Sequence, residues 1–362
     1  MSAARLWTIA RLELLQRVRT VSWYVLLGVF ALVLIGVTAL AFLAYGGWGQ
    51  SGPGVFSVVV YVTLLLVLLV SPTLSGNSIN GDRDAATLAP VQVTLVTAGE
   101  ILLGKFLAGW ITGLAFAAVA APFLVISTFA GGVNALTVVV SLAVLVLETG
   151  VIAAIGVALS GVLARPLFSV ATTYLVVAAL AVGTPLGFGL IGSAVASEGT
   201  SLTRSYEIGP DGLPLCRDGG DDCGNDPGRI VCGEWTTSTY RVPRFDYVWW
   251  MLSANPFVIL GDATPTTYNE YGYPDDLFGS LKLSVRSAQV PPSLEQRWDD
   301  CDPRIYVDDG DRRSPQQVID GTVPSWFVGL AVQIALAALL LWWAWARTRT
   351  PARKLPPGTR IA

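Results

Sequence analysis

The sequence predicts an all-α polytopic membrane protein with six transmembrane helices, an N-terminal amphipathic elbow helix and an extracellular domain between the fifth and sixth helices. That domain is expected to be disulfide-stapled and mixed in structure, with some strands. Three observations predict this class: six long apolar runs, an asymmetric distribution of charge, and four cysteines in one segment. The overall content of 53% hydrophobic and 14% charged residues agrees with it.

Each apolar run is long enough to cross a bilayer, because a hydrocarbon core of ~30 Å needs about 20 helical residues at ~1.5 Å each. Together the runs contain a single Asp, Glu, Lys or Arg, which is Glu148. The six runs are 22–45, 54–75, 106–131, 136–163, 168–196 and 324–346.

The basic residues outside 197–323 all fall on one side of this topology. They are Arg5, Arg11, Arg17, Arg19, Arg83, Lys105, Arg165, Arg347, Arg349, Arg353, Lys354 and Arg360. The opposite connections, 46–53 and 132–135, carry no charge. This positive-inside pattern predicts that the elbow helix (1–21) and the basic tail (347–362) are both cytoplasmic. Arg greatly outnumbers Lys, which favours a GC-rich bacterial genome and hence a bacterial plasma membrane.

The segment 197–323 is predicted to lie outside, because five spans separate it from the N-terminus. Between Glu198 and Asp320 it holds 21 acidic and 11 basic residues, a local balance of −10. It also holds every cysteine: Cys216, Cys223, Cys232 and Cys301. Cysteines confined to an outer segment indicate two disulfides, since thiols oxidise outside the cell. Three pairings remain open, but Cys301 must reach back at least 69 residues in any of them.

Short strand-like pieces in this domain occur at 230–231, 281–285 and 304–307, between turn signals. The stretch 247–261 differs, because it is apolar, aromatic-rich and too short to span. Its aromatic residues Tyr247, Trp249 and Trp250 suit a membrane interface. Three interpretations remain open: a helix on the outer membrane surface, a re-entrant turn, and a buried core segment of the outer domain.

Glu148 is the intramembrane acid that needs an explanation, since a carboxylate near mid-bilayer is costly. One interpretation is a proton or cation relay, or a contact to substrate. The other is structural: a protonated acid that hydrogen-bonds a neighbouring helix, with Thr172, Thr173 or Tyr174 as its partner.

The N-terminal residues 5–19 are predicted to form an amphipathic helix that lies in the inner interface and turns into the first span. Helical spacing places Trp7, Ala10, Leu14 and Val18 on its apolar face. On the opposite face we expect Arg5, Glu13 and Gln16.

The loop 76–105 is the long polar connection on the predicted inner side. It contains the charged triplet Asp82-Arg83-Asp84, then Thr87-Leu88 and Thr94, and it ends with Glu100 and Gly104-Lys105, which open the third span. In this order the residues resemble the cytoplasmic signature of ABC-2 type transporter permeases, which has a charged triplet, a T-L pair, a threonine, and then an acid and a Gly-Lys pair. The chain departs from the pattern with Asp twice in place of Glu, Ala86 in place of Gly, and Leu95 in place of Pro.

The resemblance implies the permease subunit of an ATP-driven exporter, which forms half of a translocation pathway with a second permease copy. It also implies a cytosolic ABC ATPase that docks on the loop and holds the ATP and Mg. We expect Asp82, Arg83, Asp84 and Leu88 at that contact. Other expected partners are membrane lipids and an extracellular accessory protein, with no nucleic acid.

This chain is not expected to be an enzyme or to bind a cofactor or metal itself. The string 99–106 imitates a phosphate loop, but Phe106 stands where Ser or Thr must hold magnesium. Histidine is absent, so no histidine-based triad or metal site can form. Two alternative functions remain: a signal-transmitting membrane subunit that couples a sensing outer domain to an ATPase, and a proton- or ion-coupled carrier.

Overall fold

The computed structural model describes residues 2–46, 51–84, 96–210, 212–217, 229–301 and 313–348. Within these ranges, six helical stretches are long and apolar enough to cross a membrane, which confirms the predicted number. They are Val21–Tyr45, Gly52–Arg83, Ala98–Phe129, Ala135–Val162, Pro166–Ala194 and Trp326–Thr348. The transmembrane character of the chain follows from these stretches.

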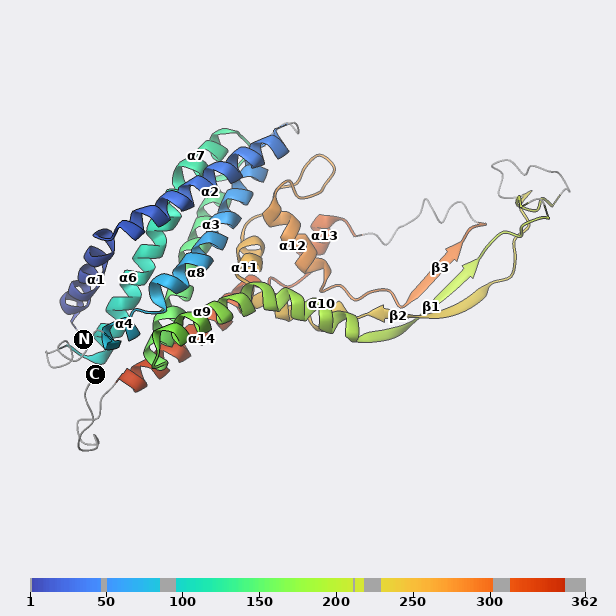
Figure 1. Ribbon diagram of the computed structural model, residues 1–362. Coiled ribbons are helices and arrows are strands. Elements are labelled where there is room, and N and C mark those ends of the chain that lie inside the picture. The colour runs from blue at the N-terminus through green and yellow to red at the C-terminus, as the bar shows by residue number, and fades with distance from the viewer. Residues whose placement is uncertain are drawn as a thin grey trace. The chain divides into compact units, whose positions relative to one another are not determined.

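The stretches are built from the helices in Figure 1. The elbow helix is α1 (Ala3–Val18), and the first span is α2 (Val21–Tyr45). The second span is α3 (Gly52–Ser75) with the short α4 (Asn80–Asp84), and the third is α6 (Ala98–Val119) with α7 (Ala121–Phe129). The remaining spans are α8 (Ala135–Val162), the series α9 (Pro166–Ala178), η1 (Ala179–Gly183) and α10 (Thr184–Ala194), and finally α14 (Trp326–Thr348).

Helix α8 lies at the centre of the helical core. It packs against α3, α6, α9 and α14, and every residue from Glu148 to Val162 is buried. Close approach requires small residues here: a Cβ on Gly156 would lie 1.9 Å from the hydroxyl oxygen of Ser75 on α3. Gly156 of this span therefore serves close helix packing.

The fifth span contains a π-helical turn, η1, whose backbone is completed by a side chain from outside the span. Pro185 has no N–H with which to bond the carbonyl oxygen of Ala181 four residues earlier. Asn255 supplies the missing donor: its Nδ2 lies 2.8 Å from Ala181 O and 3.0 Å from Thr184 Oγ1. A π-turn at a proline is thus stabilised by an external amide.

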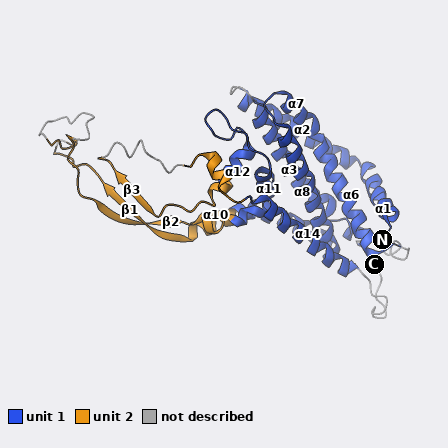
Figure 2. Cartoon of the chain, turned by 180° about the vertical axis from the view of Figure 1, so that it is seen from behind, with its two compact units in different colours: residues 1–185, 250–284, 324–362 blue, residues 186–249, 285–323 orange. Residues whose placement is uncertain are grey.

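The chain divides into two compact units, coloured separately in Figure 2. The first comprises residues 1–185, 250–284 and 324–362, and the second comprises 186–249 and 285–323. Residues 250–284, which the sequence analysis assigned to the 197–323 domain, therefore belong with the spans. They contain η4 (Trp249–Ala254) at their start, then α11 (Pro256–Ala263) and the beginning of α12 (Leu277–Ser287).

The second unit contains a three-stranded sheet of order β2-β1-β3. The central strand β1 (Ala196–Arg204) pairs antiparallel with β2 (Thr236–Pro243) and parallel with β3 (Glu295–Asp299). The unit also contains most of α10, the end of α12 (Leu277–Ser287), and the short helices η3 (Phe245–Tyr247) and α13 (Pro315–Asp320). The mixed, strand-containing character of the region is confirmed.

The strand expected at 281–285 is wrong, because these residues lie in helix α12. The apolar residues Phe278, Leu281 and Val285 recur at helical spacing, and burial of this face outweighs the local alternation. Of the other expected pieces, Ile230 forms an isolated bridge with Cys216, and 304–307 lies outside the described residues.

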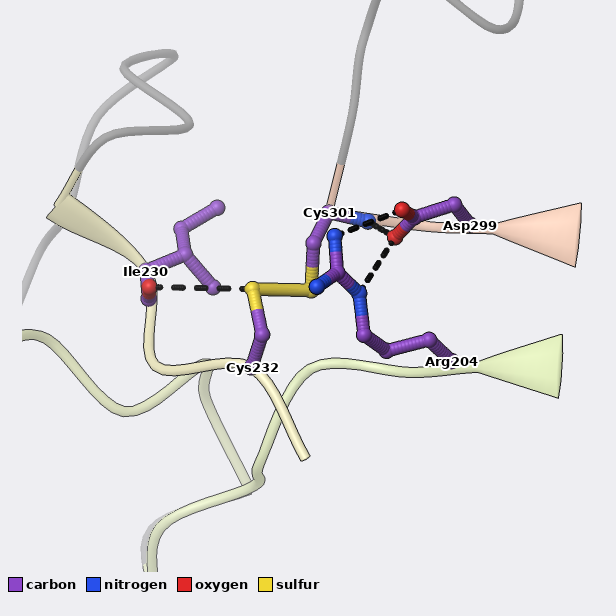
Figure 3. The surroundings of a disulfide bond; sticks show 5 residues. All are labelled: Arg204, Ile230, Cys232, Asp299 and Cys301. Atoms are coloured by element: carbon purple, nitrogen blue, oxygen red, sulfur yellow. Dashed lines mark hydrogen bonds and ion pairs between the residues drawn. A yellow bond between two sulfur atoms is a disulfide. The ribbon is translucent and has the colours of Figure 1, made fainter. Parts of the chain in front are cut away.

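A disulfide joins Cys232 to Cys301, across the expected separation of 69 residues (Figure 3). Beside it, Arg204 at the end of β1 binds the Asp299 carboxylate through two bonds of 2.9 and 2.6 Å. The same carboxylate accepts the backbone N–H of Cys301 at 3.1 Å. Cys216 is also disulfide-bonded, whereas Cys223 lies outside the described residues.

Removing the Cys232–Cys301 link with a double Cys→Ser change should lower the free energy of unfolding of the second unit by about 3–4 kcal/mol, because the bond closes a long loop. Thermal unfolding with and without reductant measures this effect. Either single Cys→Ser change should cost about as much as the double change. Alkylation of Cys232 or Cys301 in most molecules without prior reduction would contradict the assignment.

The pH dependence of stability should carry a contribution from Asp276, which caps α12 by accepting the Gly279 N–H at 2.7 Å. Burial raises the pKa of this carboxyl from its ordinary 3.8 to about 6. The folded state holds the proton more tightly than the unfolded chain does, so protonation of Asp276 contributes to the free energy of unfolding. This contribution has its full value below about pH 4 and is lost as the pH rises through about 6.

We therefore expect the wild type to lose about 1 kcal/mol more stability than the Asp276→Asn variant between pH 5 and pH 7.5. Asn keeps the capping oxygen but does not titrate. Melting curves of both proteins at the two pH values measure the difference. Parallel losses in the two proteins would exclude the contribution.

Candidate functional site

The candidate site lies where α1 and α4 meet the first turns of α6. Helix α6 begins with a capping box, in which Glu100 N donates to Thr97 Oγ1 at 3.3 Å and Thr97 N donates to Glu100 Oε2 at 2.9 Å. The spacing then places Glu100 and Gly104 on one face of α6, with Lys105 beside them. We call Glu13, Asp82, Glu100, Gly104 and Lys105 the elbow junction.

Lys105 is the central cation of the elbow junction. Its side chain is only 3% exposed, and Nζ forms ion pairs with Glu13 of α1 and with Asp82 of α4, the latter at 2.7 Å. A buried ammonium needs such partners, because an uncompensated charge costs several kcal/mol. One side chain thereby connects the elbow helix, the end of the second span and the start of the third span.

Glu100 makes the second link between α6 and the elbow helix. It is fully buried, and its Oε1 accepts the backbone N–H of Ser2 at 2.6 Å. The guanidinium of Arg5 lies 3.4 Å from the same oxygen. The N-terminal end of α1 is therefore bound to the N-terminal turn of α6.

Gly104 allows α1 and α6 to approach closely between these two links. A Cβ at this position would lie 2.8 Å from the Ile9 side chain and 3.2 Å from the carbonyl oxygen of Leu6. A larger residue would push α1 away from α6 and lengthen the Glu13–Lys105 and Arg5–Glu100 ion pairs. Glu100, Gly104 and Lys105, at the start of the third span, thus each contribute to the contact between α6 and the elbow helix.

The expected orientation of α1 needs correction. Glu13 and Arg5, expected on the polar face, form ion pairs with Lys105 and Glu100 of α6. On the apolar face Ala10 is buried, whereas Trp7 and Val18 are 53% and 47% exposed, as side chains directed at a membrane interface would be. The ion pairs with α6 outweigh the modest apolar stripe, so α1 presents apolar side chains outward, as a helix surrounded by lipid would.

Arg17 extends the contact from the other end of α1 into the bundle. Its guanidinium donates to Thr112 Oγ1 of α6 at 2.9 Å and to Leu74 O of α3 at 2.8 Å. Burial lowers the pKa of this guanidinium, and Glu13 one turn earlier acts in the opposite sense. Arg17 therefore holds the junction between α1 and α2 against two other spans.

Arg83 is bound within the chain. Its guanidinium lies 3.2 Å from Gly161 O and 3.4 Å from Leu163 O, so it caps the last turn of α8. Asp82 is likewise engaged by Lys105, although it is 35% exposed. The side chain of Asp84, together with Thr87 and Leu88, lies outside the described residues.

Glu148 lies in α8, away from the elbow junction. Two of the three hydroxyls proposed as its partners are engaged elsewhere: Tyr174 Oη donates to Leu69 O, and Thr173 Oγ1 donates to Ser169 O. Gln333 on α14 is instead the side chain directed at the carboxyl. The sequence reasoning missed Gln333, although it is a polar residue inside an apolar span.

From Trp250 onward, the stretch 247–261 belongs to the compact unit that contains most of the spans. Ile259 and Leu260 of α11 are fully buried in the same cluster as residues of α3 and α8. This packing favours the re-entrant interpretation over a core segment of the outer domain. Tyr247 and Trp250 are mostly exposed, at 55% and 61%, while Trp249 is partly buried.

The elbow junction is a set of ion pairs and hydrogen bonds that join α1 and α4 to α6. Within the described ranges, no three His, Cys, Asp or Glu residues gather to hold a metal ion. The phosphate-loop imitation at 99–106 lies in helix α6, where no loop could cradle a phosphate. Comparison with protein-family models and with curated protein sequences finds no match for this chain.

Proposed function

We propose that this chain is the permease subunit of an ATP-driven exporter of the ABC-2 type. On this proposal a second permease copy completes the pathway, and a separate ATPase binds ATP and Mg²⁺. The observation that carries the proposal is the elbow junction, since Lys105 connects three elements at the two ends of the loop that resembles the coupling signature.

The proposed coupling follows from how the loop is anchored. Residues 85–95 lie between Asp82 and the capping box at Thr97, and both anchors belong to or adjoin the elbow junction. A displacement of the loop by an ATPase would move α4 and α6 together, and Glu13 would carry the movement to α1. A loop whose ends are held by ion pairs would transmit a movement of the ATPase to the spans better than exposed charges alone.

The proposed orientation places the elbow junction in the cytoplasm of a bacterium and 197–323 outside, apart from residues packed among the spans. Support comes from the basic flanks, from the local balance of −10 in 198–320 and from the disulfide, which forms in oxidising compartments. An acidic outer region would attract cationic accessory proteins or substrates through its field.

The test is co-purification of the tagged chain from its native host in mild detergent, followed by mass spectrometry. We expect an ATPase with a phosphate loop to accompany the wild type. A variant with 85–95 replaced by a Gly-Ser linker of equal length should fold but lose the ATPase, while a variant with the exposed Arg165 changed to Ala should retain it. Failure of any ATPase to accompany the wild type, even after cross-linking, would overturn the proposal.

A further inference from the structure

Three buried side chains around Glu148 have polar atoms without hydrogen-bond partners. Both carboxyl oxygens of Glu148, Oε1 of Gln333 and Oγ of Ser253 have none. Glu148 and Gln333 are fully buried, and Ser253 is 3% exposed. Buried polar atoms almost always have a hydrogen-bond partner. A buried set without partners therefore indicates that a further atom binds there and satisfies them.

These side chains come from three elements that are packed together. Gln333 of α14 is directed at the Glu148 carboxyl of α8, and its Nε2 donates to the Ala254 carbonyl oxygen at 2.9 Å. Ser253 precedes Ala254 in η4. Packing is tight here, because a Cβ on Gly329 of α14 would lie 1.7 Å from Ser253 O.

The charged and titratable groups on the elements around α8 have other engagements. Asp262 of α11 binds the first residues of α14, Tyr174 of α9 donates to Leu69 O, and Lys105 of α6 is held in the elbow junction. The ring of Tyr61 of α3 packs against Phe278, although its buried hydroxyl has no hydrogen-bond partner. Glu100 of α6 binds Ser2, and Arg347 lies in the last turn of α14. No described cation pairs with Glu148.

We propose that Glu148 is a proton-binding site, in which the neutral carboxyl donates its proton to Gln333 Oε1. One added proton satisfies a carboxyl oxygen of Glu148 and the amide oxygen of Gln333 together. Gln333 is already oriented by its bond to Ala254. The proton is taken from water as the carboxylate enters the buried site.

A proton fits the available atoms better than a metal cation. Calcium and similar hard cations require about six to eight oxygen ligands, and magnesium requires six. Here the unpartnered set contains four oxygens and a single formal charge. An ionised carboxylate without any partner would cost several kcal/mol in such a place, whereas the neutral acid avoids that cost.

The packing of 249–263 against α14 controls exchange of this proton. While Ser253 and Ala254 lie on Gly329 and Gln333, water does not reach the carboxyl. If this segment moves away, Glu148 becomes hydrated and releases its proton. Protonation of Glu148 is therefore linked to the position of the segment, independently of any ATPase.

The experiment is infrared spectroscopy of the purified full chain in lipid nanodiscs, titrated from pH 5 to pH 9. We expect a carbonyl band of a protonated carboxylic acid at pH 7.5 in the wild type and its absence in Glu148→Gln. The exposed-carboxylate control Glu295→Gln should keep the band. Absence of a Glu148-dependent band at pH 7.5 would overturn the proposal, as would loss of the band on adding Na⁺ or K⁺ at constant pH.

A wedge variant tests the link to the segment. Gly329→Ala should force Ser253 away and lower the midpoint of the band's titration by at least one pH unit, a tenfold weaker hold on the proton. Gly36→Ala, in open space on α2, should leave the midpoint unchanged. An unshifted midpoint in Gly329→Ala would refute the link. If that variant does not fold, Gln333→Leu, which removes the acceptor, must show the same shift.

Discussion

Replacement of Lys105 by Met should detach the elbow helix from the third span and abolish coupling to a bound ATPase. The change leaves the carboxylates of Glu13 and Asp82 facing each other without their shared cation. Removing one partner of a buried ion pair costs about 3–5 kcal/mol. We expect about 3 kcal/mol in unfolding, because both carboxylates are partly exposed and can turn toward water. Thermal unfolding in detergent measures the loss.

The matched control is Arg11→Met, which removes an exposed cation from the other face of α1 and should change stability by less than about 0.5 kcal/mol. Exchange of charges in the double variant Glu13→Lys with Lys105→Glu should recover part of what Lys105→Glu alone loses. Equal losses in the single and double variants would show that the Glu13–Lys105 pair contributes nothing. Full ATPase stimulation by Lys105→Met would remove the junction from the coupling mechanism.

The spans were predictable from the sequence because their signal is local. An apolar run with no charge, such as 22–45, has no soluble alternative that buries it, and its helix corresponds closely to α2. The charged ends of the runs were equally informative. Lys105, for example, could be recognised as the residue at which the third run begins.

The orientation of the elbow helix was not predictable from α1 alone. Its own pattern places Glu13 on a polar face, yet in the structure Glu13 is directed at α6 and forms an ion pair with Lys105. The preference arises from Lys105 and Asp82, which are 92 and 69 positions from Glu13 in the chain, and a helical wheel contains no information about them. The role of Glu13 becomes clear only when the positions of α1 and α6 are both known, because its partner Lys105 lies on α6.

The surroundings of Glu148 show the same limit. Sequence reasoning sought partners in the next span, at Thr173 and Tyr174, because neighbouring spans often pack together. The structure brings Gln333 instead, from a span almost two hundred residues later. It also inserts 250–263 among the spans, since Asn255 completes the π-turn of the fifth span and caps α11. Irregular backbone at this depth is stable only where such partners exist.

Replacement of Asp262 by Ala should disrupt the start of the sixth span. Asp262 Oδ2, on α11, accepts the backbone N–H groups of Ser325 and Trp326 at 2.6 and 3.0 Å and the Ser325 hydroxyl at 2.9 Å. The carboxylate also lies at the positive end of the α14 dipole. Since Asp262 and Ser325 are both buried, water cannot simply replace the lost oxygen.

We expect Asp262→Ala to lower the free energy of unfolding by about 3 kcal/mol, the combined effect of a lost charged cap and an orphaned buried N–H. Asp262→Asn should cost about half as much, because its amide oxygen still accepts while the charge is gone. The control Asp320→Ala removes an exposed acid and should be nearly neutral. Because α11 leads directly from the segment that covers Glu148, Asp262→Ala should also increase hydrogen exchange at 256–263 more than in α2. Unchanged melting and unchanged exchange would mean that α14 keeps its first turn without the Asp262 cap, and that α11 is held in place by apolar packing alone.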